Sequence, residues 1–422
     1  MAKQKPDPKK VIIIGGGFGG LNCAKTLGGS HYQVTLIDRR NHHLFQPLLY
    51  QVAMAGLSPA DIAVPIRKEL NSYRNIRVIQ EEVTKVSPQE NKIYCGEETY
   101  SYDYLVMAAG AGHSYFGQDH WREYAPGLKT LSEATLIRAK VLKAYEMAEK
   151  TSDPAIIKKC LTFVVIGGGP TGVELAGALG EMSRFTLSKD FRTIDSRLAR
   201  VILIEAGPRI LSPFSETSSS QATRDLESLG VQIWTNSKVT AVNEDGVSIG
   251  NEQISSATVL WGAGVQASGL GRSSDLEVDR TGRILVGEDL SLKNSDNVFV
   301  IGDQAHVKDE DGKPLPGQAP PAIQQGRFVG KLLLQEAKGN TPRPAFKYWD
   351  KGQMATIGRQ RAVLESGPVR LKGFLAWIGW LVVHIYYLTG FRNRTFVVLQ
   401  WTWSHVAYRR GARLIVEKEN LK

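Results

Sequence analysis

The chain has 422 residues, 42 of them glycine, and its 52 Lys and Arg against 42 Asp and Glu give a formal charge of +10. This length exceeds what one ordinary core supports, so two or three domains are expected, and the positive charge suits an anionic surface such as a lipid headgroup layer. Nucleic acid is disfavoured as a partner, because no basic run interleaved with stacking aromatics forms a recognisable nucleic-acid module.

The chain begins with the polar stretch MAKQKPDPKK, which leaves no room for the apolar core of a signal peptide before the first predicted strand. The three cysteines, Cys23, Cys95 and Cys160, lie far apart and form no CxxC or CxxxxC pair. A disulfide framework and a dithiol redox centre are therefore not expected, and a reducing compartment fits.

The first predicted element is the strand and helix around VIIIGGGFGG, where Gly15, Gly17 and Gly20 have GxGxxG spacing. The strand QVTLID that follows the helix ends on Asp38. In such a unit the first glycine allows a tight turn, the second lets a pyrophosphate approach the backbone, and the third lets helix and strand pack. The pattern predicts that a dinucleotide binds with its phosphates at the helix N-terminus and its ribose on Asp38.

Residues 39–59, RRNHHLFQPLLYQVAMAGLSP, are apolar where a polar loop is typical. Two interpretations stay open: the apolar side chains wall a bound ring or the tunnel of its acceptor, or they pack merely as domain core. The side chains concerned are Leu44, Phe45, Pro47, Leu48, Leu49 and Tyr50.

A second glycine-rich turn of this kind follows at LTFVVIGGGPTGVELAGALGE, with Gly167, Gly169 and Gly172 at the same spacing and Glu205 at the end of the closing strand. We call these two predicted phosphate-binding turns the first and the second cradle. A carboxylate at this strand end pairs with a free 2′-hydroxyl and repels a 2′-phosphate, so NADH is favoured over NADPH. Arg209 lies close by in sequence and can weaken this preference.

Three shorter elements, YDYLVMAAGAG (102–112), VLWGAGV (259–265) and SDNVFVIGDQA (295–305), resemble elements of two-dinucleotide flavoproteins. The resemblance implies that Asp303 reaches the ribityl and pyrophosphate part of FAD. It also implies an NADH domain inserted into an FAD domain, an arrangement that aligns nicotinamide and flavin for hydride transfer. The expected domains are residues 1–150 and 280–350 for FAD, 151–279 for NADH, and 351–422 for a C-terminal segment.

The C-terminal segment contains GFLAWIGWLVVHIYYLTGF, 19 residues without Asp, Glu, Lys or Arg, and then TFVVLQWTWSHVAY after the basic interruption RNR. Basic residues flank both stretches, and aromatic and basic side chains suit the headgroup boundary of a membrane. An interfacial anchor is favoured, while a transmembrane span and a buried core helix remain alternatives. The flanking residues are Lys372, Arg392, Arg394, Arg409, Arg410 and Arg413.

The reduced flavin needs an acceptor. Disulfide reductases use a cysteine pair beside the first cradle, where only Cys23 lies, and sulfide:quinone reductases need at least two cooperating cysteines. An apolar tail that meets lipid instead favours a membrane quinone.

With these motifs the chain resembles the type II NADH:quinone oxidoreductases, single-subunit respiratory enzymes that do not pump protons. The resemblance covers nearly the whole chain and rests on GGGFGG, NHHLFQPLLYQVAMAGLSP, GGGPTGVELAG, VFVIGD, APPAIQQG and the tail GFRNR. It implies an α/β fold with two Rossmann-like dinucleotide-binding domains of the glutathione-reductase type and a C-terminal helical segment at the membrane interface. It further implies noncovalent FAD, NADH as donor, peripheral attachment to the cytoplasmic face of the cell membrane, and a homodimer.

The resemblance also assigns site residues. FAD contacts are implied at Gly15, Gly17, Gly20, Asp38, Arg39, Gln46, Val83, Ala109, Gly110, Gly302, Asp303 and Ala319. NADH contacts are implied at Gly167, Gly169, Gly172, Glu205 and Gly264.

Glu174, Gln324 and Lys372 are implied to serve catalysis. Glu174 seats nicotinamide or relays a proton, or is only a capping charge. The family's AQxAxQ quinone segment reads APPAIQ from Ala319, so Pro320 replaces the first glutamine and leaves Gln324, with Gln318 or Gln325, to bind quinone. Lys372 matches a basic residue near the quinone, although a snorkelling interfacial lysine explains it equally well.

Two rival functions share both cradles. One is an apoptosis-inducing-factor-like flavoprotein, in which NADH changes partner binding, and the other is a soluble NADH oxidase or ferredoxin reductase. The apolar tail argues against the second. His42, His43 and His306 lack metal-ligand spacing and are interpreted as polar loop groups, so no metal is expected.

Overall fold

The computed structural model describes residues 7–339, 342–388 and 412–415, and the chain divides into two compact units. Unit 1 comprises residues 1–44, 63–112 and 265–350, and unit 2 comprises residues 45–62, 113–264 and 351–422. The stretch TFVVLQWTWSHVAY and the basic residues Arg392, Arg394, Arg409 and Arg410 of the expected tail lie outside the described residues. The domain boundaries inferred from the sequence stay predictions beside these units.

A six-stranded sheet with the order β20-β21-β9-β1-β2-β5 forms the centre of unit 1. Neighbouring strands are parallel except β20 and β21, which are antiparallel. Four of the five residues of β1 are buried, as expected for a parallel sheet covered on both faces. The strands are β1 (Lys10–Ile14), β2 (Gln33–Asp38), β5 (Ile76–Gln80), β9 (Tyr104–Met107), β20 (Ser291–Leu292) and β21 (Ser295–Val300).

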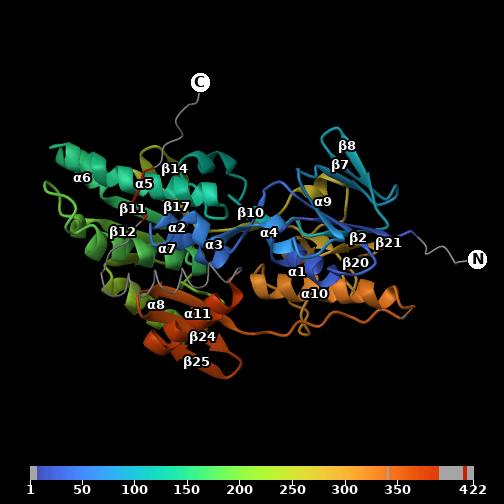
Figure 1. Ribbon diagram of the computed structural model, residues 1–422. Coiled ribbons are helices and arrows are strands. Elements are labelled where there is room, and N and C mark those ends of the chain that lie inside the picture. The colour runs from blue at the N-terminus through green and yellow to red at the C-terminus, as the bar shows by residue number, and fades with distance from the viewer. Residues whose placement is uncertain (1–6, 340–341, 389–411, 416–422) are drawn as a thin grey trace, which may run out of the picture. The chain divides into compact units, whose positions relative to one another are not determined.

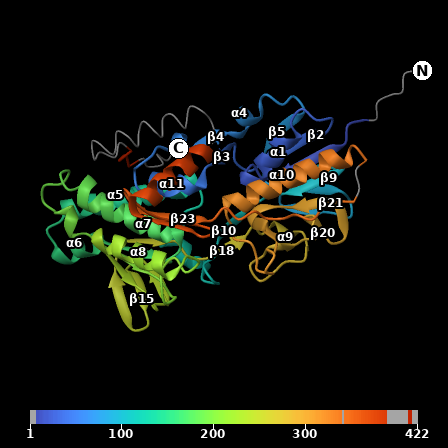
Figure 2. The ribbon, with the colours of Figure 1, turned by 90° about the horizontal axis from the view of Figure 1, so that it is seen from below.

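Two helices, α1 (Phe18–Leu27) and α10 (Ala319–Glu336), lie side by side against this sheet (Figures 1 and 2). Their backbones approach closely, because a Cβ on Gly326 of α10 would stand only 2.1 Å from the carbonyl oxygen of Gly19 in α1. Leu21 and Val329 enter one core with Val11 and other sheet residues. The expected βαβ unit is therefore present, and a helix from far along the chain completes its cover.

The opposite face of the sheet is covered by the antiparallel strands β6 (Lys85–Ser87), β7 (Lys92–Cys95) and β8 (Glu98–Ser101), whose residues Val86 and Ile93 pack with Ile12 and Leu105. Short elements fill the rest of unit 1. They are β3 (His42–Leu44), β4 (Ala63–Pro65), α4 (Ile66–Leu70), α9 (Leu270–Ser273), β19 (Ile284–Leu285), the 3-10 turn η5 (Gly302–Gln304) and β22 (Ala305–His306). Strands β10 (Ala111–His113) and β18 (Val265–Ala267) lie where the chain leaves unit 1 and returns to it.

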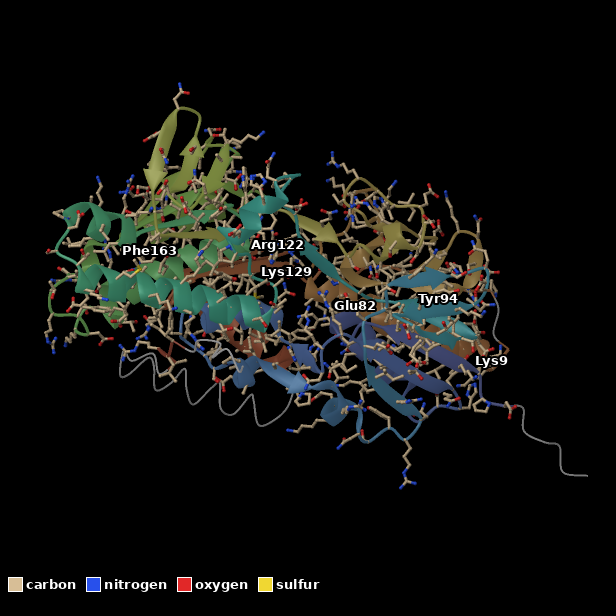
Figure 3. The ribbon with its side chains drawn as sticks, turned by 90° about the horizontal axis from the view of Figure 1, so that it is seen from above. Lys9, Glu82, Tyr94, Arg122, Lys129 and Phe163 are labelled. Carbon is tan, nitrogen blue, oxygen red and sulfur yellow. The ribbon has the colours of Figure 1, made fainter. Side chains whose placement is uncertain are left out.

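Unit 2 is built on a second parallel sheet with the order β13-β12-β11-β17. All five residues of β11 are buried, among them Phe163, which is labelled in Figure 3. The ring of Phe163 stacks on that of Tyr145, with centroids 5.2 Å apart. The strands are β11 (Thr162–Ile166), β12 (Arg200–Ile204), β13 (Val231–Trp234) and β17 (Thr258–Trp261). The helices are α5 (Leu131–Lys150), α6 (Pro154–Cys160), α7 (Pro170–Glu181) and α8 (Glu216–Ser228). An antiparallel meander comprises β14 (Ala241–Asn243), β15 (Gly246–Ile249) and β16 (Glu252–Ser255), and the short turns are η2 (Asp119–Glu123), η3 (Met182–Thr186) and η4 (Ser196–Leu198).

The sequence thus predicts both Rossmann-like sheets correctly. In unit 2 the meander residues Val247 and Ile254 share a core with Val164 of the sheet.

The apolar segment after Leu44 belongs to unit 2 and is largely helical. It contains η1 (Gln46–Leu48), α2 (Leu49–Ala53) and α3 (Pro59–Ile62), and α2 packs against both α5 and α7. Leu48, Leu49 and Val52 are fully buried. Its apolar side chains therefore contribute to the core of unit 2, whatever else they contact.

The C-terminal part of unit 2 is a three-stranded antiparallel sheet carrying one helix, and we call it the tail module (residues 353–388). It consists of β23 (Gln353–Gly358), β24 (Arg361–Ser366), β25 (Val369–Lys372) and α11 (Gly373–Tyr387). One stripe of α11, Ala376, Trp380 and His384, is buried. The opposite stripe exposes large apolar side chains, namely Phe374, Leu375, Ile378, Val382 and Tyr386. Among the described residues, no helix has the length and apolar character required to cross a bilayer.

Candidate active site

The first cradle in unit 1 has the geometry that its spacing predicts. Gly15 has φ of +99°, and a Cβ there would stand 2.3 Å from the carbonyl oxygen of Ala108. A Cβ on Gly20 would stand 1.9 Å from the carbonyl oxygen of Gly15, whereas one on Gly17 would meet no protein atom within 4 Å. Gly15 and Gly20 therefore shape the turn, and Gly17 faces the open space that a pyrophosphate needs. This cradle fits the pyrophosphate of a dinucleotide, as FAD requires.

Asp38 closes the same turn. One carboxylate oxygen accepts the N–H of Gly16 at 2.6 Å and the other accepts the N–H of Arg40 at 2.7 Å. A carboxylate has about four acceptor positions, so two remain for ribose hydroxyls.

His43 is a part of this cradle that sequence reasoning missed. It is 3% exposed, its Nδ1 lies 2.9 Å from the carbonyl oxygen of Gly16, and its ring meets Phe18 edge-on at 5.1 Å. Burial lowers the pKa of His43, so the ring is neutral and donates from Nδ1. In β3 only His43 is buried, and two adjacent histidines do not reveal from the sequence alone which of them faces inward.

The third element places its glycine at the same edge of the sheet. Gly302 has φ of +72° and donates its N–H to Oε1 of Gln325 at 2.6 Å. Gln304, directly after Asp303, accepts the N–H of Ala109 at 3.0 Å. Strands β21 and β9 are parallel neighbours, so Gly302 and Ala109 follow them at the same edge of the sheet. The hydrogen bond from Ala109 to Gln304 joins these two strand ends.

The remaining expected FAD residues are more scattered. Arg39 points its guanidinium at exposed Glu82 at 3.4 Å, and Val83 packs beside the core under β6 to β8. Ala319 begins α10, Gly110 has φ of +69°, and Gln46 lies exposed on η1 in unit 2.

The second cradle in unit 2 repeats the first. Gly167 has φ of +108°, and a Cβ on Gly172 would stand 1.8 Å from the carbonyl oxygen of Gly167. Gly169, like Gly17, faces open space. Gly264 has φ of +70°, and a Cβ there would stand 2.5 Å from the carbonyl oxygen of Ser114. The fit to a second dinucleotide is as good as in unit 1.

Glu205 occupies the position of Asp38 in this repeat. Its two oxygens accept the N–H groups of Gly168 and Gly207, each at 2.6 Å. Arg209 donates instead to the carbonyl oxygens of Ser212 and Phe214, at 2.6 and 2.7 Å. The carboxylate therefore stands at the strand end, while the guanidinium is held by the loop that follows.

Glu174 lies in the first turns of α7, partly buried, and accepts a hydrogen bond from the backbone of Thr356 in β23. Burial raises its pKa to about 8, so the carboxyl is mostly protonated at neutral pH and can donate a hydrogen bond. The same helix touches β23 again, because a Cβ on Gly177 would stand 1.7 Å from the carbonyl oxygen of Ile357. The tail module thus packs directly on the helix that carries this acid.

The expected quinone ligands fall in different units. Gln324 of unit 1 forms two hydrogen bonds with the main chain of Trp349, from Nε2 at 2.9 Å and to Oε1 at 3.0 Å. One N–H of this amide therefore remains for a ligand. Gln325 is 2% exposed, and its side-chain oxygen accepts the N–H of Gly302. Gln318 is exposed at the start of α10. Lys372 of unit 2 is exposed at the start of α11.

The apolar segment after Leu44 and the tail module meet within unit 2. The rings of Phe45 and His384 are 6.0 Å apart at 87°, and His384 also lies 4.4 Å from the ring of Trp380.

Comparison with known proteins gives a consistent picture. Residues 9–326 match the family model described as pyridine nucleotide-disulphide oxidoreductase. The chain is 43% identical to the type II NADH:quinone oxidoreductase Ndh of Mycobacterium tuberculosis, over 99% of this chain and 92% of that protein. It is 30% identical to the type II NADH:quinone oxidoreductase of Staphylococcus aureus strain NCTC 8325, over 85% of this chain and 89% of the relative. The structure of NDH2 from Plasmodium falciparum in complex with NADH shares the fold with a TM-score of 0.88, covering 97% of this chain and all of that one at 23% identity.

Proposed function

Because the chain belongs to the pyridine nucleotide-disulphide oxidoreductase family and, within it, to the type II NADH:quinone oxidoreductases, we propose how its own residues carry electrons from NADH to quinone. NADH binds the cradle of unit 2, FAD binds noncovalently in the cradle of unit 1, and the quinone arrives from a membrane on which the tail module rests. No proton is pumped. The protein acts as a homodimer on the cytoplasmic face of the cell membrane.

When bound, FAD supplies the two-electron chemistry, and the chain supplies orientation and protons. Gly15, Gly17 and Gly20 with Asp38 hold the FAD phosphates and ribose. Further FAD contacts come from Arg39, Gln46, Val83, Ala109, Gly110, Gly302, Asp303 and Ala319.

On the NADH side, Gly167, Gly169, Gly172 and Gly264 admit the dinucleotide, and Glu205 accepts hydrogen bonds from the hydroxyls of its adenosine ribose. Arg209 is held by the carbonyl oxygens of Ser212 and Phe214, which supports a preference for NADH over NADPH. Glu174, protonated because its pKa is about 8, can donate to the nicotinamide amide or pass a proton inward.

On the quinone side, the free N–H of Gln324 and the ammonium of Lys372 are the donors for a quinone carbonyl. Pro320 removes the first glutamine of the family pattern, so fewer donors remain than in relatives that have both glutamines.

The observation that carries membrane attachment is the exposed stripe of α11. Its members Leu375 and Val382 are 64% and 60% exposed although the opposite stripe of the same helix is buried. A helix that is apolar on both sides and covered on one needs a second apolar environment, and a lipid surface beside basic side chains provides it.

The test replaces the exposed stripe without touching the buried one. The double variant Leu375→Glu, Val382→Glu is compared with Leu136→Glu, which changes a side chain of α5 that is 51% exposed in the same unit. Each apolar side chain withdrawn from lipid weakens vesicle binding by about ten- to a hundredfold.

Binding is measured by co-sedimentation with phosphatidylglycerol-containing vesicles, and turnover with a membrane quinone and with ferricyanide. We expect the double variant to lose vesicle binding and membrane-quinone turnover and to keep ferricyanide reduction, with Leu136→Glu unchanged. Unaltered vesicle binding by the double variant would refute attachment through α11.

A further inference from the structure

His384 is a buried polar side chain within the apolar helix α11, and the electron transfer described above assigns it no role. It is 8% exposed and lies in the buried stripe of α11, together with Ala376 and Trp380. Both ring nitrogens of a buried histidine usually have hydrogen-bond partners, since a buried polar atom without one is unfavourable.

One nitrogen of this ring has its partner. Nδ1 lies 2.7 Å from the carbonyl oxygen of Trp380, one helical turn earlier, and a carbonyl can only accept. Nδ1 therefore carries the proton. Burial lowers the pKa of His384 to about 4, so the ring is neutral at pH 7 and Nε2 presents a lone pair.

The other nitrogen has no hydrogen-bond partner among the residues that the structure describes. This nitrogen also keeps some solvent-accessible surface, so a ligand atom can reach it. The centroid of the His384 ring lies 4.4 Å from that of Trp380 and 6.0 Å from that of Phe45. A flat aromatic ligand with a donor group suits this environment.

We propose that His384 binds the product of the reaction, with Nε2 accepting a hydrogen bond from one hydroxyl of the hydroquinone. This inference rests on the proposed quinone site and names a residue and a redox form for it. An oxidised quinone offers only carbonyl acceptors, which a neutral Nε2 cannot bond, whereas the hydroquinone offers two O–H donors. His384 thus distinguishes the two redox forms of the ring.

The experiment uses the full-length, FAD-loaded protein with a short-chain benzoquinone and its hydroquinone under anaerobic conditions. His384→Asn keeps a donor for the carbonyl oxygen of Trp380 and removes the acceptor at the Nε2 position. His384→Gln restores an acceptor oxygen near that position. The measured quantities are KM for the quinone, Ki for product inhibition by the hydroquinone, and ferricyanide reduction.

We expect His384→Asn to raise the hydroquinone Ki by about three- to tenfold, the effect of one hydrogen bond, with KM for the quinone changed less than about twofold. His384→Gln should recover part of the lost product affinity. Equal changes in KM and Ki, or an unchanged Ki in His384→Asn, would overturn the inference. A wild-type protein that reduces ferricyanide but no quinone would instead refute the proposed function itself, so the two failures are distinguishable.

Discussion

Gly17 and Gly169 are the glycines of the two cradles that face open space, and this makes their substitution selective for ligand binding. We expect Gly17→Val to fold but to purify without flavin, because its side chain occupies the space of the phosphates and its Cβ has no protein atom within 4 Å. Gly169→Val is the matched control, and it should stay yellow while NADH no longer bleaches it. The measurements are the visible spectrum before and after NADH and the far-ultraviolet circular dichroism. A yellow Gly17→Val protein would count against this motif as the FAD site.

Glu205 offers a test of donor choice. Glu205→Ala removes a charged acceptor, so kcat/KM for NADH should fall by about ten- to a hundredfold. The value for NADPH should fall less or rise, because a repelling carboxylate has gone. Asp38→Ala, the equivalent change in the other cradle, should lower FAD retention without changing the ratio of the two donors. If Glu205→Ala leaves the ratio of kcat/KM for NADH and NADPH as in the wild type, another residue recognises the ribose.

At the scale of elements, α7 and β23 are in unusually close contact. Gly177→Ala would place a methyl group 1.7 Å from the carbonyl oxygen of Ile357, so helix and strand must separate. Overpacking of this kind costs about 1–3 kcal/mol, which should appear as a lower thermal midpoint. Gly269→Ala is the control, since that glycine has φ of −63° and no neighbour within 4 Å. Equal midpoints for the two variants would contradict the contact.

The elements also show which features a sequence can reveal. The glycine turns and the acids Asp38 and Glu205 are predictable because their spacing along one βαβ unit is fixed by the geometry of the turn itself. The bonds of His43 to Gly16 and of Gln325 to Gly302 join residues 27 and 23 positions apart, and nothing local encodes them. The same holds for Thr356 and Glu174, whose contact depends on how a distant strand packs on α7. The tail helix α11 was predictable as apolar, but only the fold separates its buried stripe from its exposed one.

For the molecule as a whole, Glu174 should make stability depend on pH. Its carboxyl has a pKa of about 8 in the folded protein against 4.5 as the reference value, so between these values the folded state holds a proton that the unfolded state has lost. Stability therefore falls as pH rises from about 4.5 to about 8 and is constant beyond, by on the order of 2–4 kcal/mol. Glu174→Gln, which mimics the protonated form, should remove this fall and be the more stable protein at pH 9.

Glu365 is the control of opposite sign. Hydrogen bonds from Ser215 and its neighbours hold the pKa of Glu365 below its usual value, so its stabilisation is present at neutral pH and is lost as pH falls. Glu365→Gln should therefore be destabilised at pH 7 and approach the wild type in acid. Thermal midpoints at pH 5.5, 7 and 9 distinguish the cases, and parallel curves for the wild type and Glu174→Gln would rule out the raised pKa.

The close contact between α7 and β23 also limits which C-terminal parts can be exchanged between related proteins. A hybrid that borrows its C-terminal part from a relative must import residues 353–388 as one block, because β23, β24, β25 and α11 form a continuous antiparallel sheet and its helix. This block also requires glycine at position 177 of α7, because a Cβ there would stand 1.7 Å from the carbonyl oxygen of Ile357. Exchange of the tail module therefore requires a matched pair of parts, with the splice point just before Gly352.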